Sequence, residues 1–353
     1  MKALVIGLGA IGQRHVRNLR TLRGNQIEFL AYRVRRLSHT ITPQLTADSE
    51  HDVEQALGIQ TFDNLAVALE QKPDIALICN PTSLHVPAAL QAIRADCHLF
   101  VEKPLSDSLA GTEDLAGELE RRRRVGLVGY QMRFHPCLRR ARELLAATAI
   151  GNIIAVHAHI GEDLRTWHQY EDYRQSYAAR ADLGGGAILT QIHEIDYLYW
   201  FFGAPRRLFA VGGHLSRLEL DVEDTASILM DYDEHGRHVP VYVHQNYLQR
   251  PAKRTLEIIG DAGTIAMDLR APSLNVFDAR GHVTEAKTYD AFERNHLFLD
   301  EMRHFLNCVE GKEAPMVSAR DGIESLRIAL AAKQSLASDE PVLFSPTRPP
   351  DSI

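Results

Sequence analysis

Hydrophobic and polar positions in the first third of the chain alternate between two kinds of segment. Short apolar runs that end at glycine, proline or charged residues are typical of buried parallel strands, whereas apolar residues spaced three or four apart are typical of helices. The runs predict strands at residues 3–6, 27–32, 74–79, 98–101 and 125–129. The helical spacing predicts helices at residues 11–22, 85–95 and 109–123. Repeated strand–helix units of this kind predict an α/β domain, a parallel sheet with helices on both faces.

The pattern changes near residue 130, where strands begin to follow one another directly. Alternating segments predict strands at residues 153–160, 225–232, 239–247, 255–259 and 264–269. Turn residues at 233–236 and 260–263 connect neighbours as in hairpins. Helical spacing returns at residues 137–147, 296–309 and 321–337. We therefore predict an α/β domain over residues 1–129, an α+β domain with an antiparallel sheet over 130–345, and a proline-rich tail over 346–353.

Composition and charge narrow the classes of function. With 39 Lys and Arg against 46 Asp and Glu, the 353-residue chain has a formal net charge of −7, which opposes a general affinity for nucleic acid or an anionic membrane. No apolar run approaches the roughly 18 residues that span a bilayer. The apolar start lacks the basic region and cleavage site of a signal peptide. The four cysteines form no C-x-x-C pair and suit a reducing compartment, so we expect a cytoplasmic protein.

Two other groups of residues have simple interpretations. The basic run Arg121–Arg124 closes a predicted helix directly before a strand. A helix C-terminus whose arginines offset the macrodipole is therefore favoured over an anion site. His157 and His159 lie two apart on a predicted strand without an evident third ligand, so we expect no metal, because zinc needs three or four ligands.

The first motif that carries chemistry is Gly7-x-Gly9-x-x-Gly12. It follows a predicted strand and opens a predicted helix, which is the context that a dinucleotide fingerprint requires. Gly7 permits the tight turn, Gly9 lets the backbone approach a pyrophosphate, and Gly12 lets helix and strand pack closely. The helix N-terminus then presents unpaired N–H groups to the phosphates, and Ala10 and Ile11 lie in this same turn.

The end of the second predicted strand bears on the kind of dinucleotide. A carboxylate about twenty residues past the fingerprint accepts hydrogen bonds from the ribose hydroxyls of NAD. Here that position is Arg33, and a guanidinium suits a 2′-phosphate through charge-assisted hydrogen bonds. We therefore expect NADP(H) in preference to NAD(H). The alternative is a solvated basic loop beside an undemanding cofactor site.

Two further motifs contain side chains suited to acid–base catalysis and to the stabilisation of charge. Glu102-Lys103-Pro104 follows a predicted strand, at the sheet edge where ligands lie in open α/β sheets. A lysine there can stabilise the alkoxide that develops as a hydride leaves. His193 follows the run Gly184–Gly186 on a predicted helix and can act as a general base near neutral pH. Taken singly, the lysine has the alternative of an ordinary surface residue, and a lone histidine would usually be structural.

In their order and spacing, these motifs resemble the Gfo/Idh/MocA oxidoreductases, the relatives of glucose–fructose oxidoreductase and inositol dehydrogenase. The matching segments are GLGAIGQRH, NPTSLH, AIRADCHLFVEKPLS, YQMRF and GGGAILTQIHEIDYLYWFFG. The resemblance implies an N-terminal Rossmann domain with a doubly wound parallel sheet, then an α+β domain with a large open, mostly antiparallel sheet. It also implies a cis bond before Pro104 and a homodimer or homotetramer. The segments GQRHVRNL and HEIDYLYWFFG further resemble members associated with surface-sugar or nonulosonic-acid biosynthesis.

The resemblance also implies roles for single residues. Lys103 would be the catalytic lysine and His193 the catalytic histidine. The residues that would hold the cofactor are Gly7, Gly9, Ala10, Ile11, Gly12, Arg33, Asn80, Pro81, His85, Glu102 and Lys103. The residues that would contact substrate, several of them in a segment that resembles a substrate-covering loop, are Arg133, Trp167, Tyr173, Arg174 and Tyr177. For the loop residues, packing beneath that loop is an equal alternative.

One departure from the family pattern concerns the residues before His193. The family commonly has Asp four residues before the histidine, where this chain has Leu189. Thr190 or Gln191 could fill the polar role and contact substrate instead.

The sequence thus predicts an NADP(H)-dependent dehydrogenase or reductase that acts on a sugar, nucleotide-sugar or cyclitol. His193 would take the hydroxyl proton as the hydride leaves, and Lys103 would stabilise the charge on oxygen. Two alternatives stay open. One is a glycoside hydrolase that retains its nicotinamide and oxidises its substrate transiently. The other is a non-catalytic dinucleotide-binding regulator, for which the missing Asp argues and against which the retained Lys103 and His193 argue.

Overall fold

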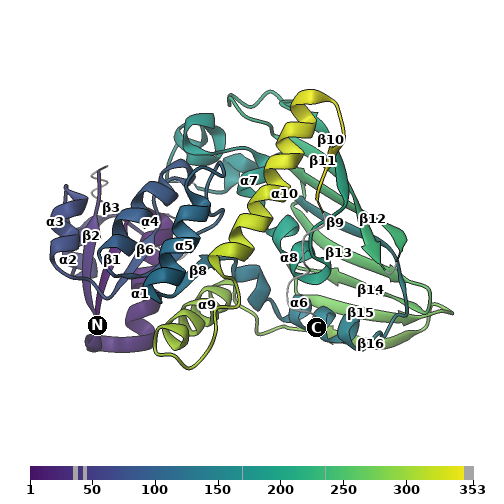
Figure 1. Cartoon of the computed structure of the whole chain (residues 1–353), viewed down its shortest axis with the longest axis horizontal. Coiled ribbons are helices and arrows are strands. Elements are labelled where there is room, and N and C mark those ends of the chain that lie inside the picture. The colour runs from purple at the N-terminus through teal and green to yellow at the C-terminus, as the bar shows by residue number, and fades with distance from the viewer. Residues whose placement is uncertain (35–38, 43–45, 169, 235, 346–353) are drawn as a thin grey trace. The chain divides into compact units, whose positions relative to one another are not determined.

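The computed structural model describes residues 1–34, 39–42, 46–168, 170–234 and 236–345 (Figure 1). The predicted tail at 346–353 lies outside the described residues. The chain forms two compact units, and neither is one continuous stretch. The first unit comprises Met1–Tyr130, Arg165–Gly185 and Asn295–Leu326. The second unit comprises Gln131–Leu164, Gly186–Arg294 and the chain from Arg327 onward.

The first unit is built on a six-stranded parallel sheet in the order β5-β2-β1-β6-β7-β8. Its strands are β1 (Lys2–Ile6), β2 (Glu28–Tyr32), β5 (Gln60–Phe62), β6 (Ile75–Ile78), β7 (His98–Glu102) and β8 (Gly126–Gly129). Chain order reverses between β1 and β6, and ligands in doubly wound sheets bind at the carboxyl ends of the strands beside such a reversal. The predicted doubly wound Rossmann sheet is therefore confirmed.

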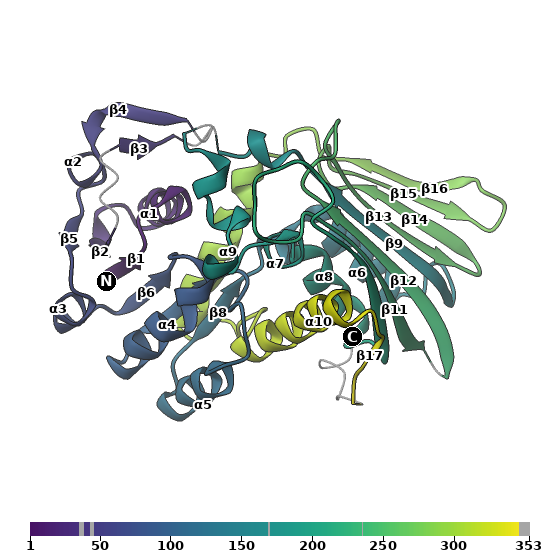
Figure 2. The ribbon, with the colours of Figure 1, turned by 90° about the horizontal axis from the view of Figure 1, so that it is seen from above.

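Helices cover both faces of this sheet (Figure 2). They are α1 (Ala10–Arg23), α2 (Val53–Leu57), α3 (Leu65–Glu70), α4 (His85–Arg94), α5 (Thr112–Arg122) and α9 (Arg294–Val309). Helices α1 and α9 share one apolar core with the strand face that carries Ala3 and Val5. Helix α4 packs on β6 and β7 and runs beside α5. A short pair of strands, β3 (His39–Ile41) and β4 (Ala47–Asp52), was not predicted by the apolar pattern.

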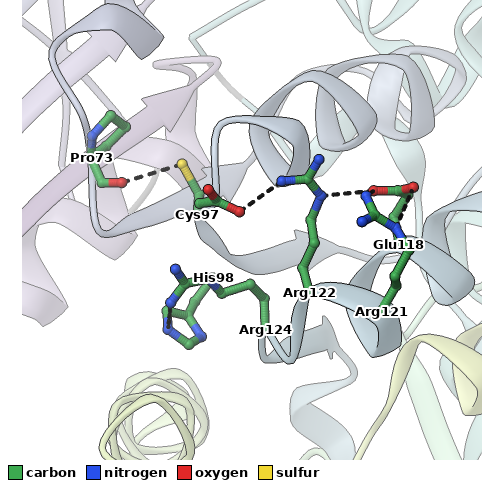
Figure 3. Close-up of polar contacts among 8 residues, drawn as sticks. Pro73, Cys97, His98, Glu118, Arg121, Arg122 and Arg124 are labelled. Atoms are coloured by element: carbon green, nitrogen blue, oxygen red, sulfur yellow. Dashed lines mark hydrogen bonds and ion pairs between the residues drawn. The ribbon is translucent and has the colours of Figure 1, made fainter.

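The basic run lies where α5 ends, and Figure 3 shows its partners. Arg121 and Arg122 each place a guanidinium nitrogen 2.7 Å from the Glu118 carboxylate one turn earlier. Arg122 also lies 2.7 Å from Asp96. The interpretation of this run as a helix C-terminus is confirmed, because neighbouring carboxylates already balance two of its arginines.

The second unit contains a nine-stranded sheet in the order β16-β15-β14-β13-β9-β12-β11-β10-β17. Its strands are β9 (Ile153–Gly161), β10 (Arg207–Gly213), β11 (Thr225–Glu234), β12 (Arg237–Asn246), β13 (Lys253–Gly260), β14 (Gly263–Asp268), β15 (Ser273–Asp278), β16 (Val283–Thr288) and β17 (Val342–Leu343). Among the described residues of this sheet, only β9 and β12 pair in parallel. The predicted large, mostly antiparallel sheet is confirmed, although the pattern missed β10, β15, β16 and β17.

One face of this sheet is covered by helices and the opposite face is not, among the residues that the structure describes (Figures 1 and 2). The covering helices are α6 (Pro136–Ala146), α7 (Ala187–Thr190), α8 (His193–Phe202) and the later part of α10 (Ala319–Ser338). Along β12 the alternation is plain, since Val241 and Val243 are buried while Pro240 and Tyr242 are exposed. The alternation fixes which side chains face the helices.

No helix among the described residues is long and apolar enough to cross a bilayer. All four cysteines are buried and unpaired. Burial raises the pKa of the Cys97 and Cys137 thiols to about 12, so these groups stay protonated near neutral pH.

Candidate active site

The glycine turn between β1 and α1 has the geometry that the fingerprint requires. Gly7 has a φ of +98°, and a Cβ on it would lie 2.6 Å from the backbone nitrogen of Asn80. A Cβ on Gly12 would lie 2.2 Å from the carbonyl oxygen of Gly7. A Cβ on Gly9 would meet no protein atom within 4 Å. Protein backbone therefore fills the space at Gly7 and Gly12, whereas the space at Gly9 is open to a ligand.

The first turn of α1 suits an anion. Gly9 is the N-cap and supplies no side-chain hydrogen bond, and the first turn holds no acidic residue. The leading N–H groups, at Ala10 and Ile11, are the ones that a helix leaves unpaired. A pyrophosphate that approaches Gly9 would meet these donors and the positive end of the helix dipole.

Arg33 follows β2 and is largely buried. Its Nη1 lies 3.4 Å from Oε1 of Glu54 on α2, and the same carboxylate oxygen accepts a hydrogen bond from Thr61 at 2.8 Å. A 2′-phosphate at Arg33 would thus have to compete with an acidic side chain that already lies beside the guanidinium.

Asn80, Pro81 and His85 lie beyond the carboxyl end of β6. The His85 ring is buried, with Nδ1 2.8 Å from the carbonyl oxygen of Pro104 and Nε2 2.8 Å from that of Asn80. Burial lowers the pKa of His85, although the two carbonyls and the charge of Glu102 act to raise it. His85 therefore ties the end of β6 to the turn after β7. The amide oxygen of Asn80 is buried without a hydrogen-bond partner in the described part of the chain, so it remains available to a ligand.

Glu102 ends β7 and Lys103 begins the turn that follows it, and the Lys103–Pro104 peptide is cis, as the resemblance implies. Oε2 of Glu102 accepts a hydrogen bond from the Lys103 backbone N–H at 3.2 Å. Oε1 lies 2.6 Å from Nε2 of His15 on α1. The sequence motifs predict no role for His15, although it lies within the matching segment GLGAIGQRH. Its position three residues past the last fingerprint glycine was the available signal.

The segment Arg165–Gly185 belongs to the first unit and packs near the Asn80–His85 turn. The hydroxyl of Ser83 donates to the carbonyl oxygen of Asp182 at 2.9 Å, and a Cβ on Gly184 would lie 2.9 Å from that of Thr82. Burial raises the pKa of Tyr177, and the negative charges of Glu102 and Glu171 raise it further.

The other three candidates of this segment are placed less directly. Trp167 and Tyr173 are partly buried. Arg174 pairs with Asp172, two residues before it, at 2.7 Å and remains about half exposed. Of the four loop residues proposed to contact substrate, Tyr177 is thus the one whose pKa responds to the charge of Glu102.

His193 begins α8 in the second unit, directly after a break between α7 and α8. The break is held by two glutamines. Gln245 donates from Nε2 to the carbonyl oxygen of Gln191 at 2.6 Å, and Gln191 donates from Nε2 to that of Asn246 at 3.1 Å. The Oε1 atoms of both glutamines are buried without a partner in the described residues. Thr190 is buried too, and Leu189 is a core side chain in place of the family Asp. Gln245 was not predicted, because nothing in its strand pattern marks it.

Arg133 and Asp196 form a buried ion pair in the second unit, with Nε–Oδ2 and Nη2–Oδ1 distances of 2.9 and 2.7 Å. The Arg133 guanidinium also lies 5.7 Å from the Trp200 ring centroid. These contacts engage the guanidinium on several sides and favour a structural role over the predicted substrate contact. A second unpredicted pair, at 2.7 Å, joins Arg254 to Glu194, the residue directly after His193.

Comparison with known families decides the affiliation. Residues 1–130 match the oxidoreductase family with an NAD-binding Rossmann fold, and residues 138–266 match the GFO/IDH/MocA C-terminal domain. The chain belongs to the GFO/IDH/MocA oxidoreductases. The family resemblance stated from the motifs is thereby confirmed, and the chain is an oxidoreductase of an NAD-binding family.

Relatives and solved structures match almost the whole chain. The chain is 27% identical to the myo-inositol 2-dehydrogenase of Thermotoga maritima, with 95% of this chain and 96% of the relative covered. It is 24% identical to the scyllo-inositol 2-dehydrogenase (NAD(+)) of Bacillus subtilis, with 97% and 96% covered. Among structures, the WlbA dehydrogenase of Bordetella pertussis, in complex with NADH and UDP-GlcNAcA, aligns with a TM-score of 0.77 at 20% identity, covering 98% of this chain and 99% of that one.

The residues of this family member fit a nicotinamide dinucleotide. Open space at Gly9, the uncapped start of α1 and the unpartnered Asn80 oxygen are the supporting observations. Phosphates would meet the α1 N-terminus, and the nicotinamide side would meet the turns at Asn80 and Lys103. No group of three or more His, Cys, Asp or Glu side chains within the described ranges is arranged to hold a metal ion.

Proposed function

We propose that this oxidoreductase moves a hydride between a nicotinamide cofactor and a hydroxyl or keto carbon of a sugar, nucleotide-sugar or cyclitol. The observation that supports the proposal most directly is the glycine turn, where only Gly9 is open to a ligand. Relatives named as inositol dehydrogenases and a neighbour bound to a UDP-sugar support the substrate class.

In the proposed reaction, Lys103 and His193 have separate tasks. When bound, the nicotinamide supplies the hydride acceptor. His193 takes the hydroxyl proton, which general acid–base catalysis makes worth about 10² to 10⁴ in rate. Lys103 donates to the substrate oxygen and stabilises its developing negative charge. In the reverse direction Lys103 polarises the carbonyl and His193 returns the proton.

Several polar groups would bind substrate hydroxyls. The proposed residues are Thr190, Gln191, Tyr177, Tyr173 and Trp167. The buried Oε1 of Gln191 is a hydrogen-bond acceptor without a donor among the described residues. Leaving such an acceptor unsatisfied costs free energy, so a hydrogen bond from a substrate hydroxyl would be favourable there. Such an acceptor suits a polyol better than an apolar substrate.

For the cofactor we propose NADP(H) over NAD(H), on the position of Arg33 after β2. Binding of a 2′-phosphate would require Arg33 to exchange Glu54 for the phosphate, a stronger and doubly charged acceptor. The test is a fluorescence titration of the protein with NADPH and with NADH, repeated on Arg33→Ala. Arg121→Ala, an exposed arginine of the same unit, is the control. Weaker NADPH binding in Arg33→Ala alone supports the preference, and tighter binding of NADH by the unchanged protein overturns it.

The function itself is tested by turnover. The protein with NAD or NADP is offered myo-inositol and UDP-N-acetylglucosamine, and the nicotinamide absorbance is followed. Appearance of reduced cofactor supports the proposal. Sugar release without net change in cofactor would point to the hydrolase, and tight cofactor binding without turnover on a wide set of sugars would point to the regulator.

We also propose a cytoplasmic homodimer or homotetramer. The uncovered face of the nine-stranded sheet carries Val211, Leu229 and Tyr242, which are 60, 52 and 38% exposed. Leu229 is directly opposite Tyr242 in the strand register, so these side chains form one apolar area. Sedimentation of the wild-type protein and of the Leu229→Asp variant tests the proposed assembly. A wild-type protein that sediments as a monomer would overturn the proposal.

A further inference from the structure

The contact between His15 and Glu102 joins two parts of the first unit that are 87 residues apart in sequence. His15 lies in the middle of α1, the helix whose N-terminus forms the glycine turn, and Glu102 ends β7. The two atoms, Nε2 and Oε1, are 2.6 Å apart, and the side chains are 0 and 10% exposed. Burying a polar pair this deeply costs desolvation free energy, whereas burying an apolar pair of similar size would not.

The direction of this hydrogen bond follows from the chemistry of the two groups. Burial alone would raise the pKa of Glu102, but the hydrogen bond and charge of His15, with Lys103 and His85, leave its pKa below the ordinary value. An ionised carboxylate only accepts, so Nε2 of His15 carries the hydrogen and donates it. Nδ1 has no partner in the described part of the chain. Among the described residues, the His15 ring thus forms its hydrogen bond with Glu102.

The His15 ring has little freedom to turn away. Its centroid lies 4.9 Å from that of Phe100 and 6.2 Å from that of Phe298, both edge-on. These two aromatic neighbours restrict rotation of the imidazole away from the orientation that points Nε2 at the carboxylate. The donor is therefore pre-oriented before any ligand binds.

Glu102 passes this constraint to the lysine turn. Its second oxygen accepts the backbone N–H of Lys103, and His85 holds the next carbonyl, that of Pro104. The titratable groups that face Glu102 from the surrounding elements are His15, Cys79, His85, Lys103 and Tyr177. Of these, His15 is the one that forms a side-chain hydrogen bond with the carboxylate among the contacts described above.

We propose that His15 is a positioning residue, which acts through Glu102 to hold the Lys103 turn in the geometry that hydride transfer needs. The proposal rests on the proposed function. It also links the two halves of the cofactor site, because the helix that would receive the pyrophosphate is the one that fixes the lysine turn.

The test compares three variants. His15→Met keeps the approximate volume and removes the donor, and His15→Gln keeps an N–H donor. Val16→Ala, at a fully buried neighbour on the same helix, removes packing and leaves the His15 donor in place. For each, kcat, KM, the pH dependence of kcat and the Tm are measured with the best substrate of the turnover screen.

We expect His15→Met to lower kcat by about tenfold to a hundredfold with a smaller change in KM, since a displaced catalytic group costs rate more than binding. Loss of the donor also lets the pKa of the buried Glu102 rise, so the acid limb of kcat moves to higher pH. His15→Gln should restore most of kcat and the position of the limb. Val16→Ala should lower the Tm and leave the limb in place.

The outcomes distinguish a failure of the positioning role of His15 from a failure of the proposed function. If His15→Met behaves like Val16→Ala, with a lower Tm and an unchanged acid limb, His15 is structural and the inference is overturned. If Lys103→Met keeps the turnover of the unchanged protein, the proposed function is overturned instead. Carboxyl ¹³C NMR of Glu102 needs no substrate. An unchanged Glu102 titration in His15→Met overturns the inference even if no substrate is found.

Discussion

Arg133 and Asp196 meet through two hydrogen bonds, at 2.9 and 2.7 Å, between side chains that are 1 and 0% exposed. The pair joins the short turn η3 (Gln131–Phe134) to helix α8, which starts at His193. It is thus part of the scaffold that holds the histidine helix.

Breaking this pair should be costly. Asp196→Asn leaves a buried guanidinium without its counter-charge, and we expect a loss of about 3 to 5 kcal/mol in the free energy of unfolding. Urea denaturation gives the value. Arg303→Ala breaks the exposed pair with Asp300 and should change stability by no more than about 0.5 kcal/mol. Equal effects of the two substitutions would contradict the role given to Arg133.

Substitutions in the glycine turn should affect cofactor binding at Gly9 and protein stability at Gly12. Gly9→Ala places a methyl group in space that holds no protein atom, so it should leave the Tm nearly unchanged. The methyl group would obstruct the pyrophosphate, and NADH affinity should fall at least about tenfold, or 1.4 kcal/mol. Gly12→Ala should instead destabilise the protein by about 1 to 3 kcal/mol through its clash with Gly7.

Gly117→Ala is the control for both substitutions. Gly117 lies inside α5, where an added Cβ meets nothing within 4 Å, so alanine there should stabilise the helix by about 0.5 to 1 kcal/mol. Its NADH affinity should not change. Full NADH affinity in Gly9→Ala would contradict the cofactor assignment.

Lys103 and His193 should affect turnover and spare cofactor binding. Lys103→Met is expected to lower kcat at least about a hundredfold by removing an electrostatic stabiliser. His193→Gln is expected to lower it by about 10² to 10⁴. Steady-state kinetics and an NADH titration on each variant provide the check, with the exposed Lys312→Met as control. A variant that loses NADH affinity in step with kcat would show a binding role in place of a catalytic one.

The buried His135 should make the stability of the fold sensitive to acid. Burial and the charge of Arg254 lower the pKa of His135 to about 4, from an ordinary value of 6.5. The unfolded chain therefore binds a proton that the folded chain refuses, so stability is lost as the pH falls from 6.5 towards 4. A shift of this size corresponds to a loss of about 3 kcal/mol at the acid end of the window.

The measurement is urea denaturation at several pH values on the protein and on His135→Asn. Asparagine also caps a helix, so it replaces the hydrogen bond that His135 accepts from the Cys137 N–H without the titration. The variant should lose part of the pH slope. His282→Asn, at an exposed histidine, should leave the slope unchanged. Parallel slopes in all three proteins would disprove the assignment.

Residues close in sequence determined much of this protein. Apolar runs and helical spacing located the six-stranded sheet except for β5, and the three glycines marked the turn before α1, because such signals depend only on neighbours along the chain. Glu102, Lys103 and Pro104 were found for the same reason, at a strand end that the apolar run itself defines.

Tertiary structure alone decided which side chains meet. Arg133 finds its partner 63 residues away and Glu102 its donor 87 residues away, and no spacing rule encodes such pairs. The strand β16 escaped prediction because nearly all of its residues are exposed and its apolar alternation is weak. Leu189 could be recognised as a departure from the family pattern, but only packing showed it to be core. The sequence thus determined the elements and the cofactor turn, while long-range burial decided the partners that hold the proposed catalytic groups in place.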